Sequence, residues 1–287
     1  MPMPINKPLP AIHGDRLMNQ LKKSIRILLV CTAAFLFAGT AFANAEKPAS
    51  SGDSNLANLI DIAGKQRMLS QKIAKAYFFY GKGIRPDKTR KQLLDSIREF
   101  DRNFEVIRKS TDNPGVQDML VFIEMAKDEL AQLAKQPYNK ENASLVLDYS
   151  ETMLEGSQDI VSRLEAESKL KKEAIVNLAG RQRMLTQRIA KYYIAYQAGF
   201  HDHNTVDQLN TAVKEFEQAQ TALIKAKRNT PQIKAELEKV KKLWHVVAKF
   251  YKDVERGGLP VIVLATTDNI MATMNQVTHQ YVELLGS

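Results

Sequence analysis

One eighteen-residue segment occurs twice in this chain, and the residues that it repeats most faithfully are polar. Ala63–Tyr80 reads AGKQRMLSQKIAKAYFFY and Ala179–Tyr196 reads AGRQRMLTQRIAKYYIAY; twelve of the eighteen positions are identical and three more exchange Lys with Arg or Ser with Thr. A helix that only buried an apolar face would keep its leucines and let Gly, Gln and Arg vary. The repeat therefore predicts a site, or a close helix contact, that is built twice.

An arginine lies near the centre of each copy, with small residues one helical turn before and after it. These neighbours are Gly64 and Ser70 around Arg67, and Gly180 and Thr186 around Arg183. A glycine inside a helix costs about 1 kcal/mol relative to alanine, so two of them need a reason, and close approach of another helix is one. A guanidinium is a planar fork of donors that matches a planar oxyanion. The segment therefore predicts a site for a nitrate-like or carboxylate anion.

A glutamine precedes each arginine at a position where the apolar stripe of the helix should continue. Gln66 lies between Leu59 and Leu69 in this stripe, and Gln182 repeats the anomaly. A buried amide without partners costs on the order of 1–3 kcal/mol. We expect both glutamines, with Ser70 and Thr186, to complete the donor set around the arginines.

A structural role for the two arginines is the alternative. Arg67 and Arg183 could each pair with an acid on a neighbouring helix, for example Glu105 or Asp148, and fix the register of the helices. The residues alone leave both interpretations open.

The elements that position these residues are helices. Beyond residue 55, apolar residues recur every three to four positions, and Pro- or Gly-containing breaks fall at 81–86, 113–114, 136–137, 199–204, 230–231 and 257–260. The copies lie 116 residues apart, and the repeat extends to Leu93 and Leu209. The predicted fold is therefore all-α: two tandem antiparallel four-helix bundles.

The connection between the bundles decides how they are arranged. No Gly or Pro occurs between Ser157 and Ala179, which favours one long shared helix from about Asn142 to Ala198, roughly 85 Å in length. The bundles would then stack end to end. A bend at 168–172 would instead place them side by side.

The start of the chain is typical of an export signal. Residues 1–45 contain basic residues, an apolar core at Ile27–Phe37 and small-x-small motifs that predict a cleavable signal peptide, with Met18 as its expected start. An uncleaved membrane anchor is the alternative. We expect a flexible linker at 46–55, a first four-helix unit at 56–165 and a second at 166–287.

Composition excludes several classes of function. After residue 45, 36 Lys/Arg face 31 Asp/Glu, a net charge of +5, and the basic residues are interleaved with acids, which argues against nucleic-acid binding. The only cysteine is Cys31, so the exported protein has no disulfide. We find no cofactor motif, no metal motif beyond an isolated His201-x-His203, and no catalytic pattern, so we predict that the protein is not an enzyme.

The repeated motif AGxQRML[ST]QxIAK resembles the signature of the NarX-like/PilJ-type sensor domain, the periplasmic part of nitrate/nitrite-sensing kinases and of type IV pili chemotaxis transducers. The resemblance implies a periplasmic four-helix bundle. In its nitrate-sensing members an arginine of this helix binds the anion at a dimer interface, and by position Arg67 and Arg183 would do so here, with Gly64 and Gly180 giving access to the backbone.

The expected function is that of an exported sensor-type protein that binds a small anion such as nitrate or nitrite. No signalling module follows the second unit in this sequence, so a membrane receptor is an expected partner, and a homodimer is a further option. The alternative is a ligand-free helical scaffold that docks a membrane receptor or another envelope partner.

Overall fold

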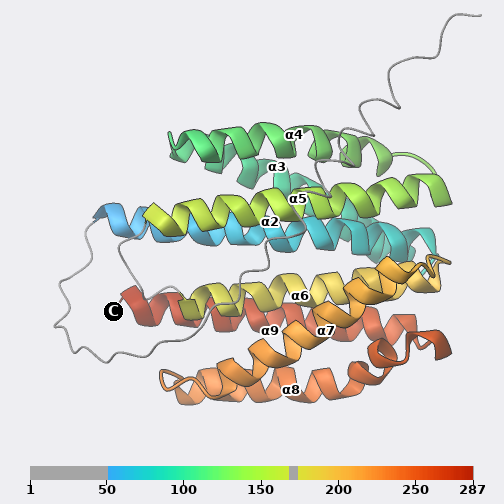
Figure 1. Ribbon diagram of the computed structural model, residues 1–287. Coiled ribbons are helices and arrows are strands. Elements are labelled where there is room, and N and C mark those ends of the chain that lie inside the picture. The colour runs from blue at the N-terminus through green and yellow to red at the C-terminus, as the bar shows by residue number, and fades with distance from the viewer. Residues whose placement is uncertain (1–50, 168–173, 287) are drawn as a thin grey trace, which may run out of the picture. The chain divides into compact units, whose positions relative to one another are not determined.

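The computed structural model describes residues 51–167 and 174–286. The predicted signal segment, its alternative as an anchor and Cys31 lie outside these ranges. Regular structure in the described ranges is helical throughout, which confirms the all-α prediction (Figure 1). The elements are α2 (Ser51–Gly81), α3 (Pro86–Ser110), α4 (Pro114–Leu133), α5 (Lys140–Glu167), α6 (Ala174–Gln197), α7 (His203–Ile224), α8 (Pro231–Lys252), the short 3₁₀ helix η2 (Val254–Arg256) and α9 (Pro260–Gly286).

Helices begin and end at the predicted breaks because local chemistry fixes their ends. Proline occupies the start of α3, α4, α8 and α9, where its missing N–H would have no helical partner anyway. Asn113 caps α4 by accepting from the Val116 amide at 3.0 Å, and Thr230 caps α8 by accepting from the Ile233 amide at 3.2 Å. Each such cap contributes about 1 kcal/mol.

The predicted linker at 46–55 overlaps the first described helix. Helix α2 already begins at Ser51.

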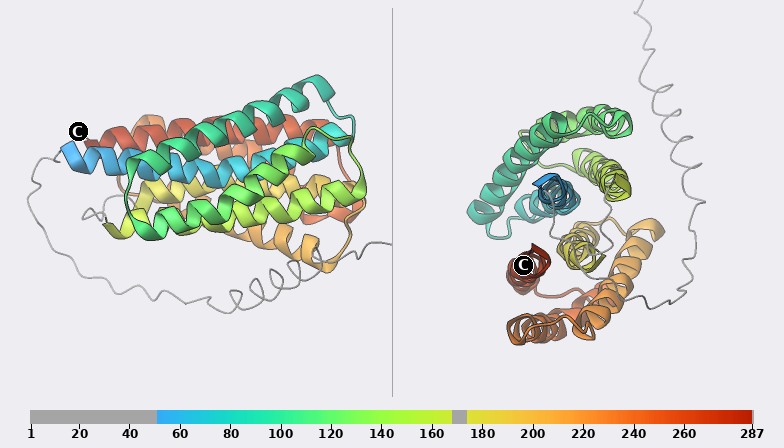
Figure 2. Two further views of the ribbon diagram at one scale, coloured as in Figure 1. Left: turned by 90° about the horizontal axis from the view of Figure 1, so that it is seen from above. Right: turned by 90° about the vertical axis from the view of Figure 1, so that its left-hand side faces the viewer.

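Four helices form the centre of the assembly. Helix α2 packs against α3, α5 and α6, and α6 packs against α2, α7 and α9. The end-on view of Figure 2 shows α2, α5, α6 and α9 in the middle, with α3 and α4 on one side and α7 and α8 on the other. Helices α2 and α6 run in the same direction, whereas α5 and α9 run opposite to them. The two motif helices therefore lie parallel and in contact.

The predicted long shared helix is wrong. Lys191 of α6 donates to the hydroxyl of Ser150 in α5 at 3.2 Å, although a continuous helix would hold these residues about 60 Å apart. The halves lie side by side, which was the alternative. Absence of Gly and Pro permits a helix to continue but does not require it, and folding back buries the apolar faces of α5 and α6 in one core.

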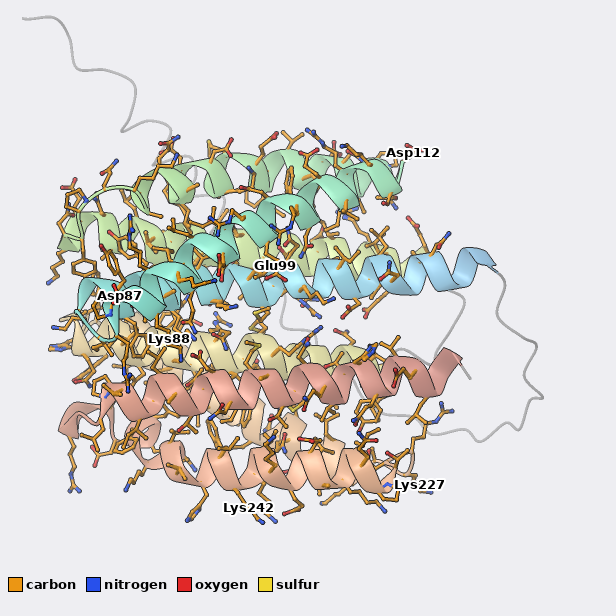
Figure 3. The ribbon with its side chains drawn as sticks, turned by 180° about the vertical axis from the view of Figure 1, so that it is seen from behind. Asp87, Lys88, Glu99, Asp112, Lys227 and Lys242 are labelled. Carbon is orange, nitrogen blue, oxygen red and sulfur yellow. The ribbon has the colours of Figure 1, made fainter. Side chains whose placement is uncertain are left out.

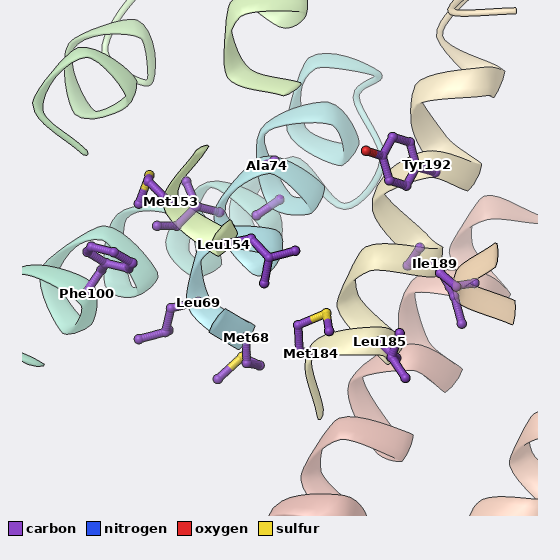
Figure 4. Close-up of a cluster of buried hydrophobic side chains, with 14 of the residues drawn as sticks. Met68, Leu69, Ala74, Phe100, Met153, Leu154, Met184, Leu185, Ile189 and Tyr192 are labelled. Carbon is purple, nitrogen blue, oxygen red and sulfur yellow. The ribbon is translucent and has the colours of Figure 1, made fainter. Parts of the chain in front are cut away.

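That core is continuous across both halves. Buried apolar residues from all eight described α-helices belong to one cluster. Figure 4 shows Met68 of α2 and Met184 of α6 pointing into the space between the motif helices; they are 6% and 5% exposed. Lys242 of α8, in contrast, projects outward (Figure 3). None of the described helices is long and apolar enough to cross a membrane.

The repeat extends over all four helices of each half, with one extra residue in the second. Equivalent positions are 116 residues apart in the first two helices, as in Leu93 and Leu209, and 117 apart in the last two, as in Pro114 and Pro231. The two halves are thus related by an internal pseudo-two-fold relation, so that equivalent positions of the two halves can be compared.

Candidate functional site

Arg67 lies at the contact between the two halves. The residue is 2% exposed. Its Nη1 donates to Oε1 of Gln158 in α5 at 2.7 Å, and its Nη2 donates to Oδ1 of Asn177 in α6 at 2.8 Å. The guanidinium therefore bridges its own half and the other motif helix.

Arg183 makes the equivalent pair of contacts. It is also 2% exposed. Its Nη1 donates to Oδ1 of Asn275 in α9 at 2.9 Å, and its Nη2 donates to Oδ1 of Asp61 in α2 at 2.9 Å. Asp61 and Asn177 occupy equivalent positions, as do Gln158 and Asn275. The site thus repeats about the pseudo-two-fold axis, with a carboxylate on one side where the other side has an amide.

The glycines of the motif provide space for these guanidinium groups. A Cβ atom added to Gly64 would lie 3.3 Å from Nη2 of Arg67, and one added to Gly180 would lie 3.2 Å from Nη2 of Arg183. Both distances are tighter than ordinary contacts. The small residue therefore lets the arginine of its own helix fold back along the helix surface toward the opposite half.

Burial leaves part of each guanidinium without a partner. Burial lowers the pKa of Arg67 to about 10, Glu165 opposes this effect, and the charge of Arg183 adds to it. Arg67 stays charged at neutral pH. The Nε atoms of Arg67 and Arg183 are both buried without a hydrogen-bond partner in the described residues, and such an unsatisfied donor is costly. The pair therefore keeps donor capacity for another acceptor.

The glutamines of the motif are buried as expected but do not reach the arginines. Gln66 donates to the backbone carbonyl of Phe100 in α3 at 3.0 Å, and Gln182 donates to that of Phe216 in α7 at 3.0 Å. Each amide thus ties the first helix of its half to the second. The amides of the motif helices therefore face other neighbouring helices than the guanidinium groups do.

The hydroxyls of the motif also stay within their own helices. Ser70 donates to the carbonyl of Arg67 at 2.9 Å, and Thr186 donates to that of Gln182 at 2.7 Å. The structure therefore brings Arg67, Arg183 and the two glycines together, whereas the predicted supporting glutamines and hydroxyls make other contacts.

Two buried lysines of the repeated segment were not among the site residues predicted from the sequence. Lys75 and Lys191 both have fully buried side chains. Lys75 donates to Asp268 of α9 at 2.8 Å, and Lys191 pairs with Glu151 of α5. Each lysine therefore reaches a carboxylate in the other half. Repetition of the lysine at the end of the IAK sequence could have indicated that it has a role. No pattern in the sequence marks the distant carboxylate as its partner.

Burial has opposite consequences for the two members of each ion pair. Desolvation lowers the pKa of Lys191 to about 8, against the attraction of Glu151. Desolvation by itself would raise the pKa of Asp268, but Lys75 and the other donors lower it to about 2. Asp268 also accepts from Lys88 and Gln92, each at 2.7 Å. These charged groups tie α2 to α9 and α6 to α5.

The fold is a helical module made of two fused copies of one repeat. The family model for the N-terminal domain of type IV pili methyl-accepting chemotaxis transducers, PilJ, matches residues 49–144 and 166–276. The chain therefore belongs to the PilJ family, with two tandem copies, as the repeated motif predicted. No curated protein and no solved structure gives a significant match.

Membership in the family indicates the class of domain to which each copy belongs. PilJ domains are non-catalytic sensor domains, and they form the periplasmic part of membrane receptors involved in chemotaxis. In the described residues no group of three or more His, Cys, Asp or Glu side chains could hold a metal ion.

Proposed function

We propose that this chain is a periplasmic sensor-type protein that binds a small oxyanion between α2 and α6, with nitrate and nitrite as first candidates. Arg67 and Arg183 are the primary ligands, and Gly64 and Gly180 give the guanidinium groups their space. The observation that carries the proposal is the presence of two buried, charged guanidinium groups at one helix contact, each with an unpartnered Nε–H.

The present acceptors of Arg67 are groups that an anion could replace. Gln158 and Asn177 are neutral amides at the ends of rotatable side chains, and a charged acceptor forms a hydrogen bond about twice as strong as a neutral one. An oxyanion that replaces an amide oxygen on the guanidinium would make this stronger contact, provided that the amide side chain turns away. Nearby low-dielectric packing strengthens the new contact.

The parallel arrangement of α2 and α6 supports the comparison with the nitrate-sensing members of the family. In those members the arginine acts at a dimer interface. Here one chain supplies both motif helices side by side, so a homodimer is not needed to complete the site. We propose a monomer in which the units at 56–165 and 166–287 take the place of two subunits, and whose receptor partner provides the signalling output.

Calorimetry on the exported protein tests the proposal. Nitrate, nitrite and chloride are titrated into the wild type, R67A, R183A and the double variant R67A/R183A, and circular dichroism checks that each variant stays helical. We expect heat with nitrate or nitrite that disappears in the double variant. Arg98→Ala, which removes an exposed arginine of α3, is the matched control and should bind as the wild type does. Undiminished binding by the double variant would exclude the arginines from the site.

The scaffold alternative also has one observation in its favour. Each arginine already has two internal acceptors, an arrangement that can hold helices in register without any ligand. This alternative predicts no heat with any of the three anions, together with a large loss of thermal stability in R67A and R183A.

A further inference from the structure

The two arginines have unequal partners, and the inequality affects what the site can bind. Arg67 donates to two neutral amides, Gln158 and Asn177. Arg183 donates to one amide, Asn275, and to the carboxylate of Asp61. Since Asp61 and Asn177 are equivalent positions of the repeat, a single pair of isosteric residues breaks the charge symmetry of the site.

Asp61 is ionised in this setting. Burial opposes its ionisation, but Arg183 and the neighbouring Lys65 lower its pKa below the usual value. Lys65 contacts its second carboxylate oxygen at 2.8 Å from the more exposed side. The carboxylate of Asp61 therefore already accepts from Arg183 at the position where an external oxyanion would bind.

Other charged groups of the described residues also act on the two arginines. Arg181 pairs with Glu215 of α7 at 2.9 Å, and Glu165 attracts Arg67. Asp61 already places a carboxylate against Arg183, whereas both amides that accept from Arg67 are neutral. One guanidinium of this kind matches one monovalent anion, because a buried divalent anion would leave a negative charge without compensation.

We propose that Asp61 is an internal counterion for Arg183, so that the site takes one monovalent oxyanion per chain, bound by Arg67 in the place of Asn177. This inference rests on the proposed function and adds to it the stoichiometry, the charge class of the ligand and the residue that determines both. Asn177 is the residue that keeps Arg67 available.

Exchanging the two residues tests this assignment. Nitrate and sulfate are titrated into the wild-type chain, D61N, N177D and D61N/N177D, all isosteric changes whose folding is checked by circular dichroism and thermal melting. We expect one nitrate per wild-type chain. N177D should bind nitrate at least about tenfold more weakly, and D61N should bind sulfate at least about tenfold more tightly, the size expected for one charge-assisted hydrogen bond.

The double exchange gives the sharpest result. D61N/N177D should recover the nitrate affinity of the wild type while its dependence moves to the other arginine: R183A should then abolish binding and R67A should not. If N177D does not fold, D61N and the double exchange carry the same test.

Other outcomes separate this inference from the proposed function. Nitrate binding that is equal in all four proteins, or that still depends on Arg67 after the exchange, overturns the role of Asp61 and leaves the anion site intact. Absence of heat in both the wild type and D61N overturns the anion site itself. Binding by D61N alone would overturn the proposed function of the native chain and support Asp61 as the residue that controls occupancy.

Discussion

The ion pair between Lys75 and Asp268 offers a direct test of how the two halves are joined. The Lys75 side chain is fully buried, and that of Asp268 is 15% exposed. Asp268→Asn keeps the shape of the side chain and removes the only negative charge with which Lys75 is paired in the described structure. Lys75 would then be a charge in the core without a counterion, which is the costly case.

The contacts of the pair set the size of the effect. Removing one partner of a buried ion pair costs about 3–5 kcal/mol of stability. Because Asp268 is partly exposed, we expect D268N to lose about 3 kcal/mol, the lower end of this range. Lys75→Met should cost less, about 1 kcal/mol, because Asp268 keeps Lys88 and Gln92 as donors. The double variant K75M/D268N should resemble K75M, since no buried charge remains.

Thermal and urea unfolding measure these differences. For a domain of this size, 1 kcal/mol shifts the melting temperature by about 2–4 °C, so D268N should melt about 6–12 °C below the wild type. Glu238→Gln, which breaks an exposed pair with Lys241 on α8, is the control and should melt with the wild type. A D268N variant that loses less than about 1 kcal/mol, or that loses no more than K75M, would refute this description of the pair.

Two further predictions concern pH and the motif glycine. The pKa of Asp268 is lowered to about 2 in the folded protein. Its contribution to the free energy of unfolding is therefore present above about pH 4 and is lost as the pH falls toward 2. Over that interval, urea unfolding should show that the free energy of unfolding falls by about 2 kcal/mol less in D268N than in the wild type. Gly64→Ala should keep or raise thermal stability through helix propensity but displace the Arg67 guanidinium, 3.3 Å from the new Cβ, and weaken nitrate binding in calorimetry. Gly156→Ala, whose Cβ would lie 2.5 Å from Ile123, should do the reverse: it should lower the melting temperature through overpacking and leave nitrate binding unchanged.

The sequence predicted the elements well because their signals are local. Apolar periodicity and the prolines at 86, 114, 231 and 260 determine where helices lie and begin. The burial of Gln66 followed from its position in an apolar stripe, and the space left by Gly64 followed from its distance of one turn from Arg67. These arguments need only the geometry of one helix.

The partners of the buried charges could not be predicted in the same way. Arg67 meets Asn177 and Lys75 meets Asp268, residues 110 and 193 positions away, and no local pattern marks the second member of either pair. These pairings depend on whether the halves stack end to end or lie side by side. The predicted long helix would have stacked the halves end to end. In that arrangement the residues of these cross-half contacts are too far apart to meet.

The prediction of the glutamines as supporting ligands illustrates a second limit. Sequence spacing groups residues that are near one another along a helix, but Gln66 and Arg67 are adjacent positions that point about 100° apart around the axis. Gln66 consequently faces α3, whereas Arg67 faces α5 and α6. Repetition showed that both residues matter without showing that they act together.

Fusion of two copies in one chain permits an arrangement that a homodimer cannot have. An exact two-fold axis places the same residue at both equivalent positions of an isologous interface, so both arginines of such a dimer would face two aspartates or two asparagines. Here the equivalent positions have diverged to Asp61 and Asn177, and the second pair to Gln158 and Asn275. Two aspartates would neutralise both arginines internally, and two asparagines would leave two positive charges buried together. The mixed pair lowers the repulsion between Arg67 and Arg183 while keeping one guanidinium with two amides as its hydrogen-bond partners, which is the condition that the proposed site for a single monovalent anion would require.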